Sequence, residues 1–267
     1  MSKLSPAIVL AAGRGERMRP LTDTCPKPLL EVQGKPLMQH HLEALAQGEF
    51  GSAVVNTAWL GEQIETKFGS ILCLQPPLNM REQLLKTEQS SDSLALHYSH
   101  EGRDFGGALE TAGGIARALP QLQTVFWSMA GDVYAPDFVF TQAAVDRFAA
   151  SSKLAHLWLV PNPAHHRKGD FGLEQPDAQG VGLCTDPPAD STAQRYTYST
   201  FALFHHALFT APWCDIPPGN PQGIKAPLAP LLRKAMAQAQ VSAEIYTGRW
   251  TDVGTPERLA ELNKPTP

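Results

Sequence analysis

A short segment near the N-terminus concentrates residues that can bind an anion. Its four basic side chains follow closely on one another, at Arg14, Arg17, Arg19 and Lys27. The small residues that precede and separate them are Ala11, Ala12, Gly13 and Gly15. Small residues at the end of a strand let backbone N–H groups approach an anion that a Cβ would keep away. The segment therefore predicts a phosphate-binding loop.

The glycine spacing of this loop distinguishes it from two common nucleotide-binding motifs. The pattern is G-x-G followed by Glu16 and Arg17, which matches neither G-x-G-x-x-G nor G-x-x-x-x-G-K-[ST]. The arginines would then supply the positive charge that those motifs obtain from the N-terminus of a helix. A surface turn with solvated arginines is the alternative interpretation.

Two aspartates follow apolar runs farther along the chain. Asp132 comes after "VFWSMAG", and Asp252 lies in "GRWTDVGTPERL". Each falls at the end of a predicted strand, where open parallel sheets bind ligands. Mg²⁺ takes one or two carboxylates and leaves its other positions to phosphate oxygens and water. The two aspartates are therefore candidate Mg²⁺ ligands, with an ordinary turn as the alternative for each.

The chain that must position these residues is 267 residues long, with an apolar fraction of 43% that is typical of a globular protein. A net charge of -4 gives no general attraction to nucleic acid or an anionic membrane. The apolar run near the N-terminus is too short for a signal sequence or a membrane span. Four well-separated cysteines suggest neither a disulfide framework nor a zinc site. We expect a cytoplasmic protein.

Short apolar runs alternate with helical patterns, which predicts an α/β fold with a mainly parallel sheet flanked by helices. The expected strands are 7–11, 53–57, 125–130, 154–160 and 197–204. The expected helices are 36–47, 60–68, 112–119, 137–149 and 226–239. The polar stretch 75–93 is interpreted as a surface insertion, and the irregular region 162–195 as the substrate side of a cleft. With no linker evident, residues 1–267 are expected to form one domain.

The N-terminal run A-A-G-x-G-x-R-M-x-P-L-T, followed by P-K-P-L around Lys27, resembles the N-terminal motif of the sugar nucleotidyltransferases. Further resemblance in "ETAGGIARALP", "YTYSTFALFHHALF", "APLAPLLRKAM" and "GRWTDVGTPERLAE" extends it over most of the chain. The resemblance implies a Rossmann-like, GT-A-like fold with a nucleotide-binding half at 1–132 and a sugar-binding half at 133–267. It implies transfer of a nucleotidyl group from UTP to a sugar 1-phosphate, release of pyrophosphate and a requirement for Mg²⁺.

The same resemblance assigns roles to individual residues. Arg17, Lys27, Asp132 and Asp252 would be catalytic, with Asp132 and Asp252 holding the metal and Arg17 and Lys27 facing the phosphates. The nucleotide would be bound by Ala11, Ala12, Gly13, Gly15, Glu16, Arg17, Arg19, Lys27, Asn56, Glu110, Thr111 and Gly113. The sugar would be bound by Ala130, Asp170, Ser199 and Lys225. The sugar phosphate is already ionised at neutral pH, so the reaction needs alignment and charge neutralisation more than a general base.

Within this family the chain resembles the branch that uses N-acetylmuramic acid α-1-phosphate in cell-wall sugar recycling. In "NPAHHRKGDFGL" the basic run at 165–168 precedes Asp170 and could meet the lactyl carboxylate of muramate. Two departures from the family pattern are Ala130, where Asn is usual, and Thr200, where Gly is common.

Other acceptors and one non-enzymatic role remain open at this point. The N-terminal motif also fits guanylyl transfer to mannose 1-phosphate and uridylyl or thymidylyl transfer to glucose 1-phosphate. A nucleotide-binding regulatory subunit without catalytic activity is the non-enzyme alternative. We expect a monomer or small homo-oligomer without nucleic-acid or membrane partners.

Overall fold

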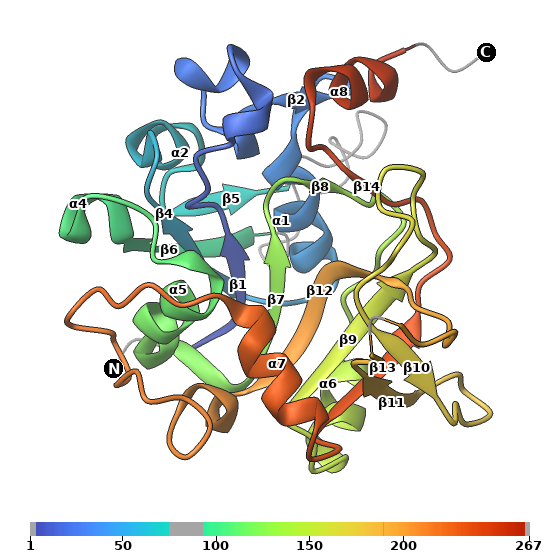
Figure 1. Cartoon of the computed structure of the whole chain (residues 1–267). Helices are drawn as coiled ribbons and strands as arrows, with labels where there is room; N and C mark the ends of the chain where they lie inside the picture. The colour runs from blue at the N-terminus through green and yellow to red at the C-terminus, as the bar shows by residue number, and fades with distance from the viewer. Residues whose placement is uncertain (1–3, 75–92, 189, 265–267) are drawn as a thin grey trace, which may run out of the picture.

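A ten-stranded mixed sheet runs through the molecule (Figure 1), which is a computed structural model describing residues 4–74, 93–188 and 190–264. In spatial order the strands are β10 (Gly172–Glu174), β11 (Gly182–Thr185), β13 (Val241–Ile245), β9 (Ala155–Val160), β12 (Thr197–His205), β7 (Leu122–Ala130), β1 (Ser5–Leu10), β4 (Ser52–Thr57), β6 (Ser93–His100) and β5 (Ile71–Cys73). The helices are α1 (Leu37–Gln47), α2 (Gly61–Phe68), α4 (Glu101–Phe105), α5 (Glu110–Ala118), α6 (Gln142–Ala150), α7 (Leu228–Met236) and α8 (Pro256–Leu262). No helix in this part of the chain combines the length and apolarity needed to cross a bilayer.

The strands β7, β1, β4 and β6 are parallel neighbours, so their carboxyl ends meet along one edge of the sheet. Strand β12 runs antiparallel to β7, and its first residues therefore lie at that same edge. In open α/β sheets the crevice outside these carboxyl ends is where ligands bind. The topology thus brings the ends of β1, β4, β6 and β7 together with the beginning of β12.

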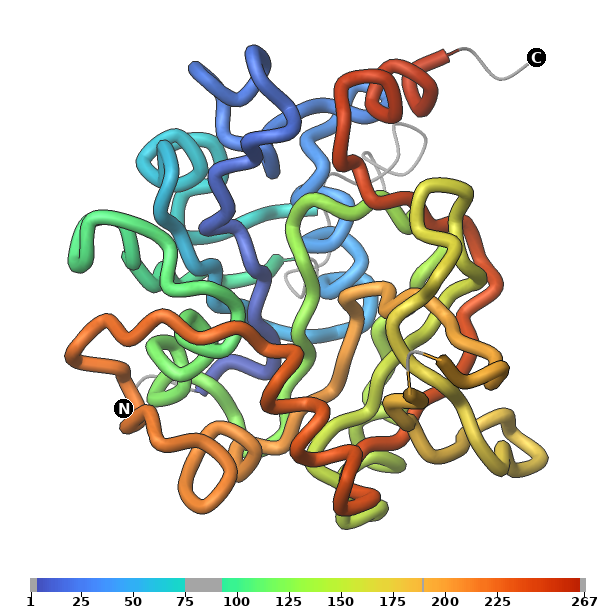
Figure 2. Tube along the Cα trace, viewed as in Figure 1, coloured from blue at the N-terminus to red at the C-terminus, as the bar shows by residue number. Residues whose placement is uncertain are grey.

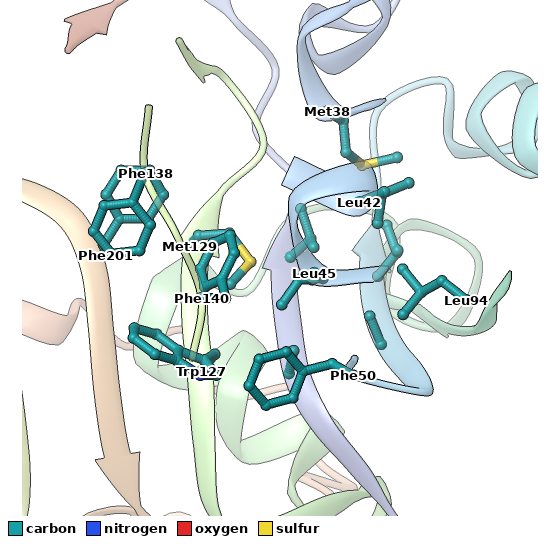
Figure 3. Packing of buried hydrophobic residues seen from close by; sticks show 14 of the residues in the cluster. Met38, Leu42, Leu45, Phe50, Leu94, Trp127, Met129, Phe138, Phe140 and Phe201 are labelled. Atoms are coloured by element: carbon teal, nitrogen blue, oxygen red, sulfur yellow. The ribbon is translucent and has the colours of Figure 1, made fainter. Parts of the chain in front are cut away.

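Two apolar cores cover the two faces of the sheet. On one face α1, α2 and α6 pack over side chains such as Val9, Trp127 and Leu203. On the other, α5 and α7 pack over the alternate residues of the same strands, among them Ile8 and Phe126. Neighbouring strand residues point to opposite faces, so each strand supplies both cores. Figure 3 shows the α1 side of the first core, including the labelled Trp127.

A third, smaller core anchors the phosphate-binding segment. Met18, Leu37 and Val253 are fully buried in it, and Leu259 and Leu262 of α8 pack against them. The chain returns here at its C-terminal end, and Figure 2 shows the red C-terminal helix beside the blue N-terminal segment. The residues before α1 form three short 3₁₀ turns and the small hairpin of β2 (Glu31–Val32) and β3 (Lys35–Pro36). Both ends of the chain thus build the region around Lys27.

The predicted α/β architecture is confirmed, with differences at particular elements. Helix α6 begins five residues later than expected because the Thr141 side chain accepts a hydrogen bond from the Ala144 N–H and caps it. The region 162–195, expected to be irregular, contains the paired strands β10 and β11. The sequence reading also missed β6, β13 and α8. Of the expected insertion at 75–93, residues 75–92 lie outside the described residues, and Ser93 begins β6.

Candidate active site

A cavity of about 630 Å³ opens at the carboxyl ends of β1, β4, β6 and β7. Eleven of the predicted site residues line it: Ala11, Ala12, Gly13, Gly15, Lys27, Asn56, Glu110, Thr111, Ala130, Asp132 and Asp170. They come from six separate segments of the chain, and the sheet topology brings them together. The cavity has the size of a ligand site and carries both signs of charge.

Seven other predicted residues do not line this cavity: Glu16, Arg17, Arg19, Gly113, Ser199, Lys225 and Asp252. Ser199 is fully buried and donates a hydrogen bond of 2.6 Å to the Trp158 carbonyl, so it supports β12 from inside. Lys225 is exposed in the segment that leads into α7. Gly113 lies within α5, where its N–H donates to the Ala226 carbonyl.

The phosphate-binding loop is folded back on itself around Gly15. This residue has a φ of 69°, and its carbonyl accepts a hydrogen bond of 2.9 Å from the Thr22 hydroxyl. A Cβ at position 15 would lie 3.0 Å from the Thr22 methyl group and 3.2 Å from the Lys27 Cβ. Glycine is therefore required here by both backbone conformation and space.

The arginines of the loop have different environments. Arg14 donates to Asp23 at 2.9 Å and stacks over the Trp59 ring at 3.7 Å from its centroid, so it holds the loop together. Arg19 also pairs with Asp23, at 2.8 Å, and these two guanidinium groups lower the pKa of that carboxyl. Arg17 is exposed, and no hydrogen bond or ion pair joins its side chain to another described residue. Among the loop arginines, Arg17 is thus the one whose charge is available to a ligand.

Lys27 reaches the cavity from the short 3₁₀ helix Lys27–Leu29, which follows the loop. Only 8% of Lys27 is exposed, and its Nζ lies 2.5 Å from Asp132 Oδ2. Asp132 follows β7 directly and keeps 37% of its side chain exposed toward solvent. Burying an ammonium group is costly unless it is paired, so Asp132 stabilises Lys27 in the free protein. The pair places a cation and a carboxylate at one wall of the cavity.

Asp252 lies next to Asp132 in the fold but faces other partners. The short strands β8 (Val133–Tyr134) and β14 (Thr251–Asp252) pair antiparallel, and the Val253 N–H donates to the Asp132 carbonyl at 3.3 Å. The Asp252 carboxylate is 2.5 Å from the Arg258 guanidinium and 2.8 Å from the His165 ring. The backbone thus joins the two predicted metal ligands while their side chains bind separate cations.

A buried hydrogen-bond chain supports the other wall of the cavity. The Ala11 N–H donates to Asn56 Oδ1 at 2.7 Å, and Asn56 Nδ2 donates to Glu101 Oε1 at 2.7 Å. The Leu109 N–H donates to Glu101 Oε2, also at 2.7 Å. Burial raises the pKa of the Glu101 carboxyl, although the hydrogen bonds from Leu109 and Asn56 act in the opposite direction. The chain links the phosphate loop to the ends of β4 and β6.

Asp170 occupies the end of the cavity formed by the second half of the chain. One of its oxygens accepts a hydrogen bond of 2.8 Å from the Tyr198 N–H, and the other lies 3.0 Å from the His166 ring. Thr200 lines the same end, and its hydroxyl accepts a hydrogen bond of 3.3 Å from the Ala130 N–H. Its φ of 76° is unusual for a residue with a branched Cβ. The two departures from the family pattern, Ala130 and Thr200, therefore contact one another.

The cavity also contains residues that sequence reasoning missed. Glu101 went unnoticed because β6 was not predicted, although the alternation of Leu94, Leu96 and Tyr98 in that strand was a usable signal. The face of α7 contributes Leu228, Ala229, Leu232 and Arg233. In the sequence these residues look like an ordinary amphipathic helix, and nothing in the pattern separates Arg233 from a solvated surface charge.

Comparison with known proteins extends these geometric observations. The profile of the nucleotidyl transferase family matches residues 6–266. An N-acetylmuramate alpha-1-phosphate uridylyltransferase of Neisseria meningitidis serogroup B is 42% identical over 261 residues, covering 96% of this chain and 95% of that protein. The mannose-1-phosphate guanylyltransferase catalytic subunit beta of Drosophila melanogaster is 32% identical over 139 residues, which is 51% of this chain and 32% of that protein.

Solved structures match the fold over nearly the whole chain. A putative glucose-1-phosphate thymidylyltransferase from Bacillus anthracis superposes with a TM-score of 0.70 at 17% identity, covering 96% of this chain and 93% of that one. A UTP-bound UGPase from Acinetobacter baumannii gives a TM-score of 0.68 at 14% identity, covering 97% and 92%. At these identities the likeness confirms the architecture of the sheet and its helices.

Proposed function

The chain belongs to the nucleotidyl transferase family, and we propose that it transfers the uridylyl group of UTP to N-acetylmuramic acid α-1-phosphate. The products are UDP-N-acetylmuramic acid and pyrophosphate. The observation that carries the assignment is the 42% identity to the Neisseria enzyme over almost the full length of both chains. The cavity supports it, because a loop rich in N–H groups, Lys27 and Asp132 meet in one place. We place the reaction in cytoplasmic recycling of cell-wall sugars.

The reaction needs little proton transfer, but it requires neutralisation of the negative charges on the reacting phosphates. An oxygen of the sugar phosphate attacks the α-phosphorus of UTP in line, while pyrophosphate leaves from the other side. The nucleophile is ionised at neutral pH, so alignment and the repulsion between anions determine the barrier. Residues 11–15 would receive the triphosphate through backbone N–H groups, with Arg17 approaching it from the rim. Lys27 would move from Asp132 toward the α-phosphate as charge develops there.

A divalent ion fits the donor set of this site. Mg²⁺ holds one or two carboxylates and completes its shell with substrate phosphates and water, so a cage made entirely of protein ligands is not expected. Accordingly, the described residues contain no group of three or more His, Cys, Asp or Glu side chains arranged to hold a metal. Asp132 and Asp252 would hold the ion. When bound, it would neutralise charge on the α-phosphate and on the leaving pyrophosphate.

The two halves of the cavity would bind different parts of the substrates. Asn56, Glu110 and Thr111 lie near the ends of β4 and at the start of α5, and we assign them to the nucleoside. Asp170 and the Ala130 backbone lie at the other end, and we assign them to the sugar. Ser199 and Gly113 would act only indirectly, because Ser199 is buried against the Trp158 carbonyl and the Gly113 N–H is bonded to the Ala226 carbonyl.

The direct test is a substrate panel read by pyrophosphate release. The panel pairs UTP, GTP, dTTP and ATP with the α-1-phosphates of N-acetylmuramic acid, N-acetylglucosamine, glucose and mannose. We expect UTP with the muramate compound to give the highest kcat/KM. Lys27→Ala is the low-activity control. Arg147→Gln, which alters an ion pair with Glu244 outside the cavity, is the control that should keep wild-type activity. Preference for mannose 1-phosphate and GTP would contradict the proposed acceptor, and binding of UTP without turnover would favour a regulatory subunit.

A further inference from the structure

Arg233 is the second basic side chain in the cavity wall. Across the ranges that the structure describes, Lys27 and Arg233 are the two lysines or arginines that line the cavity. Lys27 is buried beside Asp132 at the end where we place the reacting phosphate. Arg233 projects from α7 and is half-exposed. It therefore remains as the cation for a second negative group on a bound substrate.

The contacts of Arg233 place it at the sugar end of the cavity. Its Nε donates to Asp186 Oδ2 at 2.9 Å. The other oxygen of Asp186 lies 3.5 Å from the guanidinium of Arg195, which in turn donates to the Asp170 carbonyl at 2.7 Å. A short series of side chains thus connects Arg233 to Asp170, which lines the same cavity.

Arg233 shares its carboxylate partner with a second arginine. The single carboxylate of Asp186 pairs with both Arg195 and Arg233, so Arg233 has no carboxylate of its own. The Nη groups of Arg233 make no hydrogen bond to another described residue. The edge formed by these two groups can bind a carboxylate through two parallel hydrogen bonds.

The proposed acceptor carries a matching second anion. N-acetylmuramic acid differs from N-acetylglucosamine by a lactyl ether on C3 that ends in a carboxylate. Asp170 would repel this group, so the sugar end must supply a cation. The basic run expected to do so does not line the cavity: His165 binds Asp252, and His166 binds Asp170. Arg167 and Lys168 are exposed outside it.

We infer that Arg233 binds the lactyl carboxylate of the acceptor and so determines its selection over sugar phosphates without that group. The inference rests on the proposed function, because it assumes that the muramate compound is a substrate. Charge-assisted hydrogen bonds of this kind contribute about 1.5–3 kcal/mol, which corresponds to roughly 10–100-fold in kcat/KM. Since Arg233 is half-exposed, we expect the lower part of that range.

The test compares kcat/KM for the α-1-phosphates of N-acetylmuramic acid and N-acetylglucosamine at saturating UTP. Arg233→Gln removes the charge, Arg233→Lys keeps it without the planar fork, and Arg147→Gln is the matched control. Arg147 is similarly exposed on α6 and pairs with Glu244 at 3.2 Å, away from the cavity. If N-acetylglucosamine 1-phosphate is not turned over, its inhibition constant against the muramate compound replaces its kcat/KM.

We expect Arg233→Gln to lower the ratio of muramate to glucosamine kcat/KM at least about tenfold, mainly through KM. Arg233→Lys should recover part of this loss, and Arg147→Gln should keep the wild-type ratio. An unchanged ratio in Arg233→Gln would overturn the inference. This holds if kcat/KM falls equally for both sugar phosphates, as expected for a contact with the phosphate, and also if neither value falls. Failure of the wild-type protein to use the muramate compound would instead overturn the proposed function, and the inference with it.

Discussion

Replacing Glu101 with Gln should test whether one buried carboxylate sets the polarity of the cavity wall. Glu101 accepts hydrogen bonds from Asn56 Nδ2 and from the Leu109 N–H, and Asn56 Oδ1 accepts from the Ala11 N–H. Both groups that form hydrogen bonds with the Glu101 carboxylate are donors. A glutamine can satisfy only one of them, because its NH₂ group would face a second donor. If the Asn56 amide rotated to compensate, its own NH₂ would face the Ala11 N–H.

The size of the effect follows from burial. Glu101 and Asn56 are both almost inaccessible to solvent, so a donor facing a donor cannot be satisfied by water. Leaving one buried polar group unsatisfied costs about 1–3 kcal/mol. For a chain of this length that corresponds to a fall in Tm of roughly 3–10 °C. Glu101→Gln should therefore be clearly destabilised although it is nearly isosteric and removes a buried charge.

The pH dependence of this cost has a definite sign. Burial raises the folded-state pKa of Glu101 above its unfolded value. Its contribution to wild-type stability is therefore fully present below the unfolded pKa and is lost as pH rises through the raised folded pKa. The hydroxyl oxygen of a protonated carboxyl can still accept a hydrogen bond, which an NH₂ group cannot, so the cost of Gln persists when Glu101 is protonated. Because Gln does not titrate and the pKa of Glu101 is raised, the difference in unfolding free energy between the two proteins should be largest at acidic pH and shrink toward neutrality.

Urea unfolding of both proteins at several pH values from 4 to 8 measures this difference, and the other titrating groups cancel between them. Glu101→Ala serves as a second variant, since it removes both acceptors and should lose more stability. A Glu101→Gln protein as stable as wild type at every pH would refute the argument from donor polarity. A difference that grows with pH would refute the assigned direction of the pKa shift.

Three further results are expected. Gly13→Ala should keep wild-type stability but raise the KM for UTP, because a Cβ at position 13 meets nothing within 4 Å in the free protein. Gly15→Ala should lower the free energy of unfolding by about 1–2 kcal/mol in urea, because Gly15 has a positive φ and a Cβ there would crowd the Thr22 methyl group. Lys27→Ala should lower kcat/KM by about 10²–10³-fold in the pyrophosphate assay, the scale of one lost electrostatic stabiliser, and a loss under tenfold would contradict its role. Asp132→Ala and Asp252→Ala should each remove most activity at ordinary Mg²⁺ with the fold intact by circular dichroism, and wild-type rates in both would exclude the metal site.

The sequence predicted the parts of the fold that depend on local pattern. Strand β1 and the small residues after it are recognisable because an apolar run and glycines are both local signals. The alternation in β6 is equally local, but it follows directly on the polar stretch 75–93 and was not predicted as a strand. Strands β10 and β11 are short, and they join the sheet because β11 pairs with β13 and β10 pairs with β11. Such pairing depends on tertiary contacts, which a pattern of a few residues does not contain.

Prediction of the site was limited because its side chains form ion pairs with residues that are far away in the sequence. Lys27 and Asp132, which the motifs indicated as candidates, line one cavity although they are 105 residues apart in the chain. The motifs could not indicate that Asp252 would face Arg258 and His165, since that contact depends on where α8 and the 162–195 region pack. They equally could not distinguish Arg233 from other surface arginines.

The charged groups of the free site are held by partners of opposite sign. Lys27 pairs with Asp132, and Asp252 pairs with Arg258. Unpaired charges in a partly buried cavity would cost free energy, so these pairs stabilise the protein without substrate. Binding of a divalent ion at Asp132 competes with Lys27, which lines the same cavity, and the phosphates of UTP offer Lys27 a new partner. Because each event makes the other less costly, ion and nucleotide should bind with positive coupling that is reciprocal by thermodynamic necessity.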